Sequence, residues 1–251
     1  MLELQHLSFL VDVDGKDKDI IRDISLEIPD DKLVVVTGPN GGGKSTLAKL
    51  IAGVETPTGG KIYFQGEDIT SLSITERAKR GIAFAFQQPV KFKGIRVIDL
   101  LRIASGKRLS VANACDYLSA VGLCARDYID REVNASLSGG ELKRIEIATV
   151  LARKAALSVF DEPEAGIDLW SFQNLIEVFR NLRKSDQARS ILIISHQERI
   201  LEIADEIIVL KDGMVDRRGS RDEILPSLIG TSAAVNYCSK MDATTGGNAP
   251  C

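Results

Sequence analysis

The sequence has few of the residues from which metal centres are built. It holds four cysteines and two histidines in 251 residues, and no two cysteines are spaced as Cys-x-x-Cys. A metal site within the chain is therefore poorly supported, and reduced thiols are expected. The chain also lacks an excess of basic residues, because its formal net charge is −3. This balance argues against nucleic acid as a main partner.

Long apolar stretches are missing too. No hydrophobic run approaches the length of a membrane-spanning helix, and the first residues lack the profile of a signal peptide. A chain that is 44% hydrophobic and 27% charged is nevertheless expected to fold around a sizeable core. We expect a cytoplasmic protein without direct membrane insertion, so that another polypeptide crosses any membrane involved.

The most informative stretch is glycine-rich and reads Gly-Pro-Asn-Gly-Gly-Gly-Lys-Ser-Thr. It fits the pattern G-x-x-x-x-G-K-[ST] and lies between a β-branched run, 33–36, and a helical run, 47–53. A strand, a glycine turn and a helix N-terminus form a cradle for phosphate groups. The stretch predicts binding of a nucleoside triphosphate, with Lys44 on the β- and γ-phosphates and Ser45 on Mg²⁺. The cradle residues would be Gly38, Pro39, Asn40, Gly41, Gly42, Gly43, Lys44, Ser45 and Thr46.

Two neighbouring carboxylates follow another apolar run. The predicted strand 157–160 leads directly into Asp161 and Glu162. Carboxylates at the carboxyl end of a strand suit a nucleotide site. Asp161 can hold Mg²⁺, and Glu162 is placed to orient or deprotonate an attacking water molecule.

Two further strands end in polar residues. The strand 82–86 runs into Gln87, and the strand 191–194 is followed by Ser195 and His196. Ligand contacts gather at such strand ends, so Gln87 and His196 are candidate site residues. For Gln87 an ordinary strand-end position is an equally good interpretation, and a lone histidine is more often structural.

Helical spacing replaces strand signals between residues 97 and 153, which predicts a helical lobe inserted into an α/β core. Near its end, Ser138, Gly139 and Gly140 open a predicted helix. Ser138 is a suitable N-cap, and the glycines leave backbone N–H groups open to an anion. Two interpretations of this segment remain open: a second phosphate site, and an ordinary capped start of a helix.

The ends of the chain complete the expected organisation. Alternating patterns at 2–10 and 20–28 predict an antiparallel pair of strands. A strand pair after residue 206 and a helix near 220–229 would close the fold, and small polar residues beyond it predict a mobile tail. We therefore expect one domain, 1–229, with a core in 1–89 and 155–229, a helical subdomain in 90–154 and a flexible tail in 230–251.

In chain order these motifs resemble an ABC-type ATPase cassette. They are the glycine-rich loop, Gln87, Leu-Ser-Gly-Gly-Glu at 137–141, the strand ending in Asp161 and Glu162, then Asp168 and His196. The resemblance spans roughly residues 1–229. It implies a P-loop NTPase (RecA-like) core of the α/β class, with an N-terminal antiparallel β subdomain and an inserted α-helical subdomain.

The resemblance also implies roles for single residues. ATP and Mg²⁺ would be held between two cassettes in an ATP-dependent dimer, so that Ser138, Gly139 and Gly140 contact ATP bound by the partner copy. Mg²⁺ would be held by Ser45, Gln87 and Asp161. Glu162 would be the catalytic carboxylate and His196 the switch histidine. Gln87 would sense Mg²⁺ and the partner, and Asp168 would belong to the loop that crosses the dimer interface.

Local sequence is most similar to SufC, the ATPase of iron–sulfur cluster assembly. The similarity lies in four segments, 85–90, 137–144, 165–168 and 195–201. It implies a SufB/SufD-like scaffold as the partner protein. Pro163 after the glutamate follows the transporter form instead, so the alternative is the ATPase subunit of a membrane transporter, with a membrane permease as partner.

Overall fold

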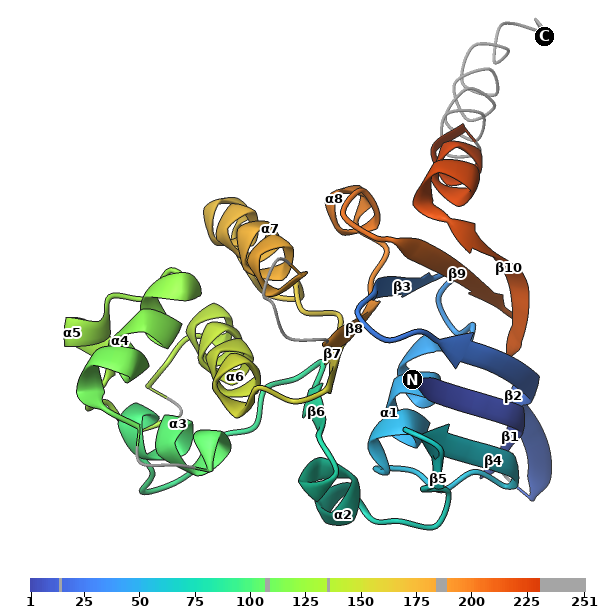
Figure 1. The fold of residues 1–251 in the computed structure, drawn as a ribbon, viewed down its shortest axis with the longest axis horizontal. Helices are drawn as coiled ribbons and strands as arrows, with labels where there is room; N and C mark the ends of the chain where they lie inside the picture. The colour runs from blue at the N-terminus through green and yellow to red at the C-terminus, as the bar shows by residue number, and fades with distance from the viewer. Residues whose placement is uncertain (14, 107–108, 135, 184–188, 231–251) are drawn as a thin grey trace, which may run out of the picture.

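The structure is a computed structural model that describes residues 1–13, 15–106, 109–134, 136–183 and 189–230. An antiparallel four-stranded sheet forms its N-terminal part (Figure 1). Its strand order is β2-β1-β4-β5. Leu2 pairs with Ile28 and Leu4 with Leu26, so apolar residues at every second position share one buried face. The predicted strand pair is confirmed, with longer strands than expected. The bounds are β1 (Leu2–Val13), β2 (Lys16–Ile28), β4 (Gly59–Phe64) and β5 (Glu67–Asp68).

A second sheet of six strands has the order β10-β9-β3-β8-β7-β6. All neighbours pair in parallel except β10, which runs antiparallel to β9. Strands β3 and β8 are buried along their whole length, which explains why they read as continuous apolar runs. The bounds are β3 (Leu33–Thr37), β6 (Ile82–Ala85), β7 (Leu157–Asp161), β8 (Ser190–Ile194), β9 (Glu206–Lys211) and β10 (Met214–Ser220).

The two faces of this sheet belong to different cores. Along β3, Leu33 and Val35 pack with the helices that follow residue 97, whereas Val34 and Val36 pack with the first helix and the N-terminal sheet. Successive side chains of a strand point to opposite faces, which produces this division. The six-stranded sheet is therefore covered on both sides.

Helices occupy both sides of the sheet (Figure 1). Helix α1 begins at Lys44, directly after the glycine-rich loop, and ends before Gly53, which takes the left-handed conformation. The helical lobe contains α3 to α6, and residues 221–230 form a last described helix. The bounds are α1 (Lys44–Ala52), α2 (Ile74–Lys79), α3 (Val97–Ser105), α4 (Val111–Ala120), α5 (Ala125–Tyr128), α6 (Gly139–Arg153), α7 (Leu169–Arg183) and α8 (Glu198–Leu201).

The α/β class, the antiparallel subdomain and the helical insertion are thus as predicted. The domain boundaries given above stay predictions, and the tail beyond residue 230 lies outside the described residues. Among the described helices, none is both long enough and apolar enough to cross a membrane.

A buried arginine on α2 completes the C-terminal end of α1. The Arg77 side chain is almost fully buried, with 1% of the residue exposed. Its guanidinium donates to the carbonyls of Leu50 (2.6 Å), Ile51 (3.0 Å), Thr70 (2.8 Å) and Leu72 (3.0 Å). Leu50 and Ile51 lie in the last turn of α1, where carbonyls lack the N–H donor four residues on; the carbonyl of Leu50 also accepts from the N–H of Gly53 at 3.3 Å. Arg77 therefore fixes the helix that carries the glycine-rich loop.

Arg77→Met is expected to lower the free energy of unfolding by about 3 kcal/mol or more, because it leaves several buried carbonyls without donors. Urea denaturation measures the loss. Arg80→Met is the matched control, since Arg80 forms a partly exposed ion pair with Glu67, and such pairs contribute about 0–1 kcal/mol. Equal losses in the two variants would contradict this role of Arg77.

Candidate nucleotide-binding site

The glycine-rich loop connects β3 to α1 and is pressed against neighbouring backbone. Gly38 has φ +135°, and a Cβ at this position would lie 1.9 Å from the carbonyl oxygen of Leu210. Gly43 has φ +93°, and its Cβ would lie 2.8 Å from the carbonyl oxygen of Ile20. Only glycine satisfies both the left-handed conformation and the close approach. The loop is therefore held open at the N-terminus of α1, as binding of an anion requires.

Lys44 folds back over this loop. Its ammonium donates to the carbonyl oxygens of Gly38 and Pro39, both at 2.9 Å. Burial lowers the pKa of Lys44, and the nearby carboxylates of Glu162 and Asp161 act in the opposite direction. The positive charge of Lys44 is thus fixed at the place where the loop would receive phosphate groups.

Ser45 and Asp161 meet beside the loop. The Ser45 hydroxyl donates to Oδ1 of Asp161 at 2.9 Å, although 116 residues separate them. Asp161 is buried, and burial raises the pKa of its carboxyl group. A hydroxyl and a carboxylate oxygen are the hard ligands that Mg²⁺ prefers, so this pair fits a magnesium ion.

Gln87 and Glu162 form the second contact of the site. Nε2 of Gln87 donates to Oε2 of Glu162 at 2.7 Å. Glu162 has φ +44°, an uncommon conformation for a residue with a side chain, and its N–H donates to the carbonyl of Ile194. Strained backbone of this kind persists where the surroundings fix it, often at functional sites. The structure therefore brings together two residues that the sequence places 75 positions apart.

His196 lies at the edge of the site. Together with Gly38 and Pro39 it lines a hollow of about 510 Å³. The preceding residue, Ser195, is fully buried and donates from its hydroxyl to Oε1 of Glu164 at 2.6 Å. Burial raises the pKa of Glu164, a carboxyl group that the sequence reasoning missed. This bond joins the segment after Glu162 to the strand end that presents His196.

Ser138 caps α6, as the sequence predicts. Its hydroxyl accepts from the N–H of Glu141 at 3.3 Å, and the Glu141 carboxylate accepts from the N–H of Ser138 at 2.6 Å. Ser138 and Gly139 are exposed, and a Cβ on Gly139 would meet no atom within 4 Å. The start of α6 is thus an open surface with free room for a ligand.

The loop of Asp168 lies against the start of α6. A Cβ on Gly140 would lie 3.0 Å from the carbonyl oxygen of Gly166. Asp168 caps α7, because its Oδ1 accepts from the N–H groups of Trp170 (3.1 Å) and Ser171 (3.0 Å). The bond from Ser171 is the main cause that lowers the pKa of Asp168. Both capping residues therefore have a structural task within the chain.

The structure does not place the glycine-rich loop and the start of α6 on one side of the sheet. The apolar residues of α1 belong to one core and those of α6 to the other. Figure 1 shows the two helices on opposite sides of β6 and β7. The starts of these two helices, each a predicted anion site, are therefore separated by the sheet.

Outside this site the structure gives little sign of metal chemistry. Within the described part of the chain, no three side chains of His, Cys, Asp or Glu come together as a metal site. Cys115 is half-buried and Cys124 is exposed, and both are free thiols. Cys238 and Cys251 lie outside the described residues.

These features define a P-loop nucleotide hydrolase. They are the glycine-rich loop, the lysine folded over it, and the Ser45–Asp161 pair at the carboxyl ends of parallel strands. The chain belongs to the ABC transporter family, whose model matches residues 21–165. The expected ABC-type ATPase cassette is thus confirmed, and the chain is an ATPase that binds ATP.

Relatives and solved structures agree with this family. An uncharacterized ABC transporter ATP-binding protein of Methanocaldococcus jannaschii is 37% identical, over 82% of this chain and 85% of its own length. A probable ATP-dependent transporter of Synechocystis is 34% identical, over 88% and 90%. The dimeric post-hydrolysis structure of an ATP-binding cassette with ADP and phosphate has a TM-score of 0.79 at 22% identity, covering 88% of this chain and 99% of that chain. The descriptions of the two relatives name transporter proteins, and none of the three descriptions shows the SufC-type role.

Proposed function

We propose that this cassette is the ATP-hydrolysing subunit of a membrane ABC transporter. Two copies would close around ATP and, by closing, move a partner permease. The observation that supports the dimer is the separation of the glycine-rich loop from Ser138 on opposite faces of one sheet. A second copy is needed to bring a Ser138 onto a bound triphosphate, and the related cassette with ADP and phosphate is described as dimeric.

Each residue of the site has a chemical task in this proposal. Lys44 holds the β- and γ-phosphates, and Glu162 orients and deprotonates the attacking water. Ser45, Asp161 and Gln87 would hold Mg²⁺, which supplies positive charge to the phosphates when bound. His196 would contact the terminal phosphate from the edge of the site. Asp168 would lie in the loop that meets the partner copy.

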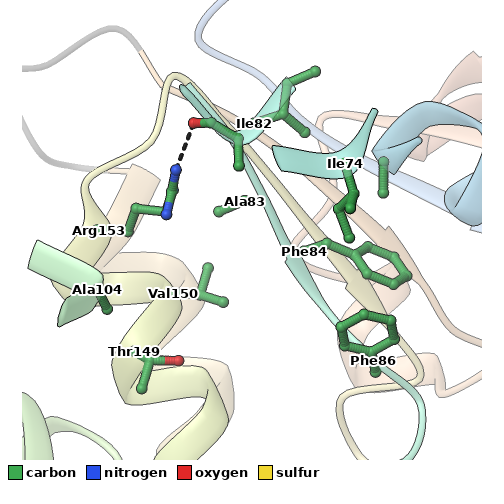
Figure 2. Close-up of a pocket in the computed structure, with 11 residues that line it drawn as sticks. Ile74, Ile82, Ala83, Phe84, Phe86, Ala104, Thr149, Val150 and Arg153 are labelled. Carbon is green, nitrogen blue, oxygen red and sulfur yellow. Dashed lines mark hydrogen bonds between the residues drawn. The ribbon is translucent and has the colours of Figure 1, made fainter. Parts of the chain in front are cut away.

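A groove beside the Gln87 segment suits a partner protein. An apolar hollow of about 200 Å³ lies between β6 and α6. Figure 2 shows Ile74, Phe84 and Phe86 along one wall of it. A second hollow of about 140 Å³ shares Phe84 and Phe86 and extends to Val90. Ile74 is 39% exposed and Val90 45% exposed. An apolar segment of another chain would bury these side chains next to Gln87. A movement of that segment would then displace the backbone that carries Gln87.

Ile74→Glu is expected to reduce recovery of the partner at least tenfold in pull-downs from detergent-solubilised membranes, while basal ATP hydrolysis stays unchanged. Glutamate is favourable in the first turn of a helix, so α2 is retained. Val111→Glu is the control, because Val111 is the exposed first residue of α4, away from the groove. Equal recovery with both variants would contradict docking at this groove.

A second candidate is ATP-driven assembly of iron–sulfur clusters on a SufB/SufD-like scaffold. The observation in its favour is the SufC-like sequence of the four segments, among them Lys143 and Arg144 after the signature glutamate. The same pull-down, run on both the solubilised membranes and the soluble fraction, separates the two functions. A membrane-spanning partner supports transport, whereas a soluble scaffold recovered through the groove supports assembly.

A further inference from the structure

Two buried charges follow the start of α6. Lys143 and Glu146 are one turn apart on this helix, with side chains 0% and 13% exposed, and Nζ lies 3.4 Å from Oε2. Their neighbours Leu142, Ile145 and Ile147 are apolar core residues. A buried ion pair contributes little stability by itself, so the position of these charges calls for another reason.

Both side chains form hydrogen bonds with the backbone next to Gln87. The N–H of Phe86 donates to Oε1 of Glu146 at 2.9 Å. The ammonium of Lys143 donates to the carbonyl of Phe86 and, at 3.3 Å, to that of Gln87. The peptide groups on both sides of Phe86 are therefore held by one helix. The side chain of Gln87 meanwhile reaches Glu162.

Lys143 also reaches the neighbouring strand. Its Nζ lies 3.5 Å from the carbonyl oxygen of Asp161, the residue before Glu162. One ammonium thus touches the ends of β6 and β7, at the points where Gln87 and Glu162 leave the sheet. The same helix begins at Gly139, and its N-cap Ser138 is fixed to the first turn by the capping box with Glu141.

We propose that Lys143 and Glu146 are positioning residues that hold Gln87 against Glu162 and couple both to the start of α6. A displacement of Ser138 on binding the partner's ATP is then transmitted to Gln87 through one rigid helix. This inference rests on the role proposed above for Gln87 in holding Mg²⁺. It differs from simple core packing, because it predicts that the pair acts through Gln87.

The test uses the double variant Lys143→Met with Glu146→Gln in the full chain. The substitution leaves no unpaired charge, and the glutamine oxygen can still accept from the N–H of Phe86. We expect kcat to fall roughly tenfold and the Mg²⁺ concentration for half-maximal rate to rise several-fold, while affinity for ATP without Mg²⁺ stays within about twofold. The matched control is Arg180→Met with Glu177→Gln, an exposed pair with the same spacing on α7, which is expected to leave all three values unchanged.

A comparison with Gln87→Ala separates positioning from packing. If the pair acts through Gln87, adding Gln87→Ala to the double variant lowers kcat no further than Gln87→Ala alone, because coupled residues are not additive. Additive losses would overturn the proposal and leave the role of Gln87 intact. A Gln87→Ala variant with wild-type Mg²⁺ dependence would overturn both, while ATP hydrolysis through Glu162 stays testable by itself.

A second substitution covers the case in which the double variant does not fold. Lys143→Gln keeps a donor for one carbonyl and is expected to show an intermediate fall in kcat with a similar change in Mg²⁺ dependence. Wild-type values in a folded Lys143→Gln protein, checked by thermal melting, would also overturn the proposal.

Discussion

Glu162→Gln is expected to abolish ATP turnover while ATP binding is retained. The amide cannot accept a proton from the attacking water, and loss of a general base lowers rates by roughly 100- to 10,000-fold. Its oxygen can still accept the bond from Gln87, so the geometry at the end of β7 is kept. Phosphate release measures turnover, and equilibrium dialysis measures ATP binding.

The same variant is expected to accumulate as an ATP-bound dimer, because closure is no longer reversed by hydrolysis. Trp170 gives a direct signal, since it is the single tryptophan of the chain, is 83% exposed and lies two residues after Asp168. We expect its emission to shift to shorter wavelength when ATP is added, together with a doubling of mass in light scattering. Glu177→Gln, an exposed carboxylate on α7, is the control. Wild-type turnover by Glu162→Gln would refute the assignment of the catalytic carboxylate.

Ser138→Arg is expected to reduce ATP hydrolysis by at least 100-fold without loss of ATP binding to the same chain, because a bulky cation replaces the surface that a partner's ATP would contact. Removing the N-cap also costs about 1 kcal/mol of stability. Ser110→Arg isolates that cost, because Ser110 caps α4 in the same way, accepting from the N–H of Asn113 at 3.1 Å. Similar melting temperatures with loss of activity only in Ser138→Arg are predicted. Full activity in Ser138→Arg would contradict a role for α6 in catalysis.

The sequence was most informative where local rules apply. Alternation predicts the N-terminal strand pair, the glycine pattern predicts the loop before α1, and the residue types at 138–140 predict Ser138 as a helix cap. Helix α1 begins at Lys44, three residues before the helical run predicted at 47–53, because the glycine-rich loop leads into the helix without an intervening turn.

The remaining features depend on which strands become neighbours. Gln87 could meet Glu162 only because β6 pairs with β7, and no local pattern predicts that pairing. The hydrogen bonds of Lys143 and Glu146 to the backbone of Phe86 depend on how α6 packs against the same strands. A usable signal was nevertheless present, because two charges one turn apart interrupt an otherwise apolar helix face. The identity of the partner depends on another chain and is not encoded in the site residues.

Mixing two inactive variants tests the shared site most directly. A Lys44→Ala chain lacks a working phosphate loop, and a Ser138→Arg chain lacks a working α6 surface. A mixed dimer contains one intact site, made from the loop of the second chain and the α6 start of the first. Equal amounts of the two are predicted to recover about a quarter of wild-type ATP turnover, because about half of randomly formed dimers are mixed and each has one of two sites intact. A mixture no more active than its separate components would contradict the account.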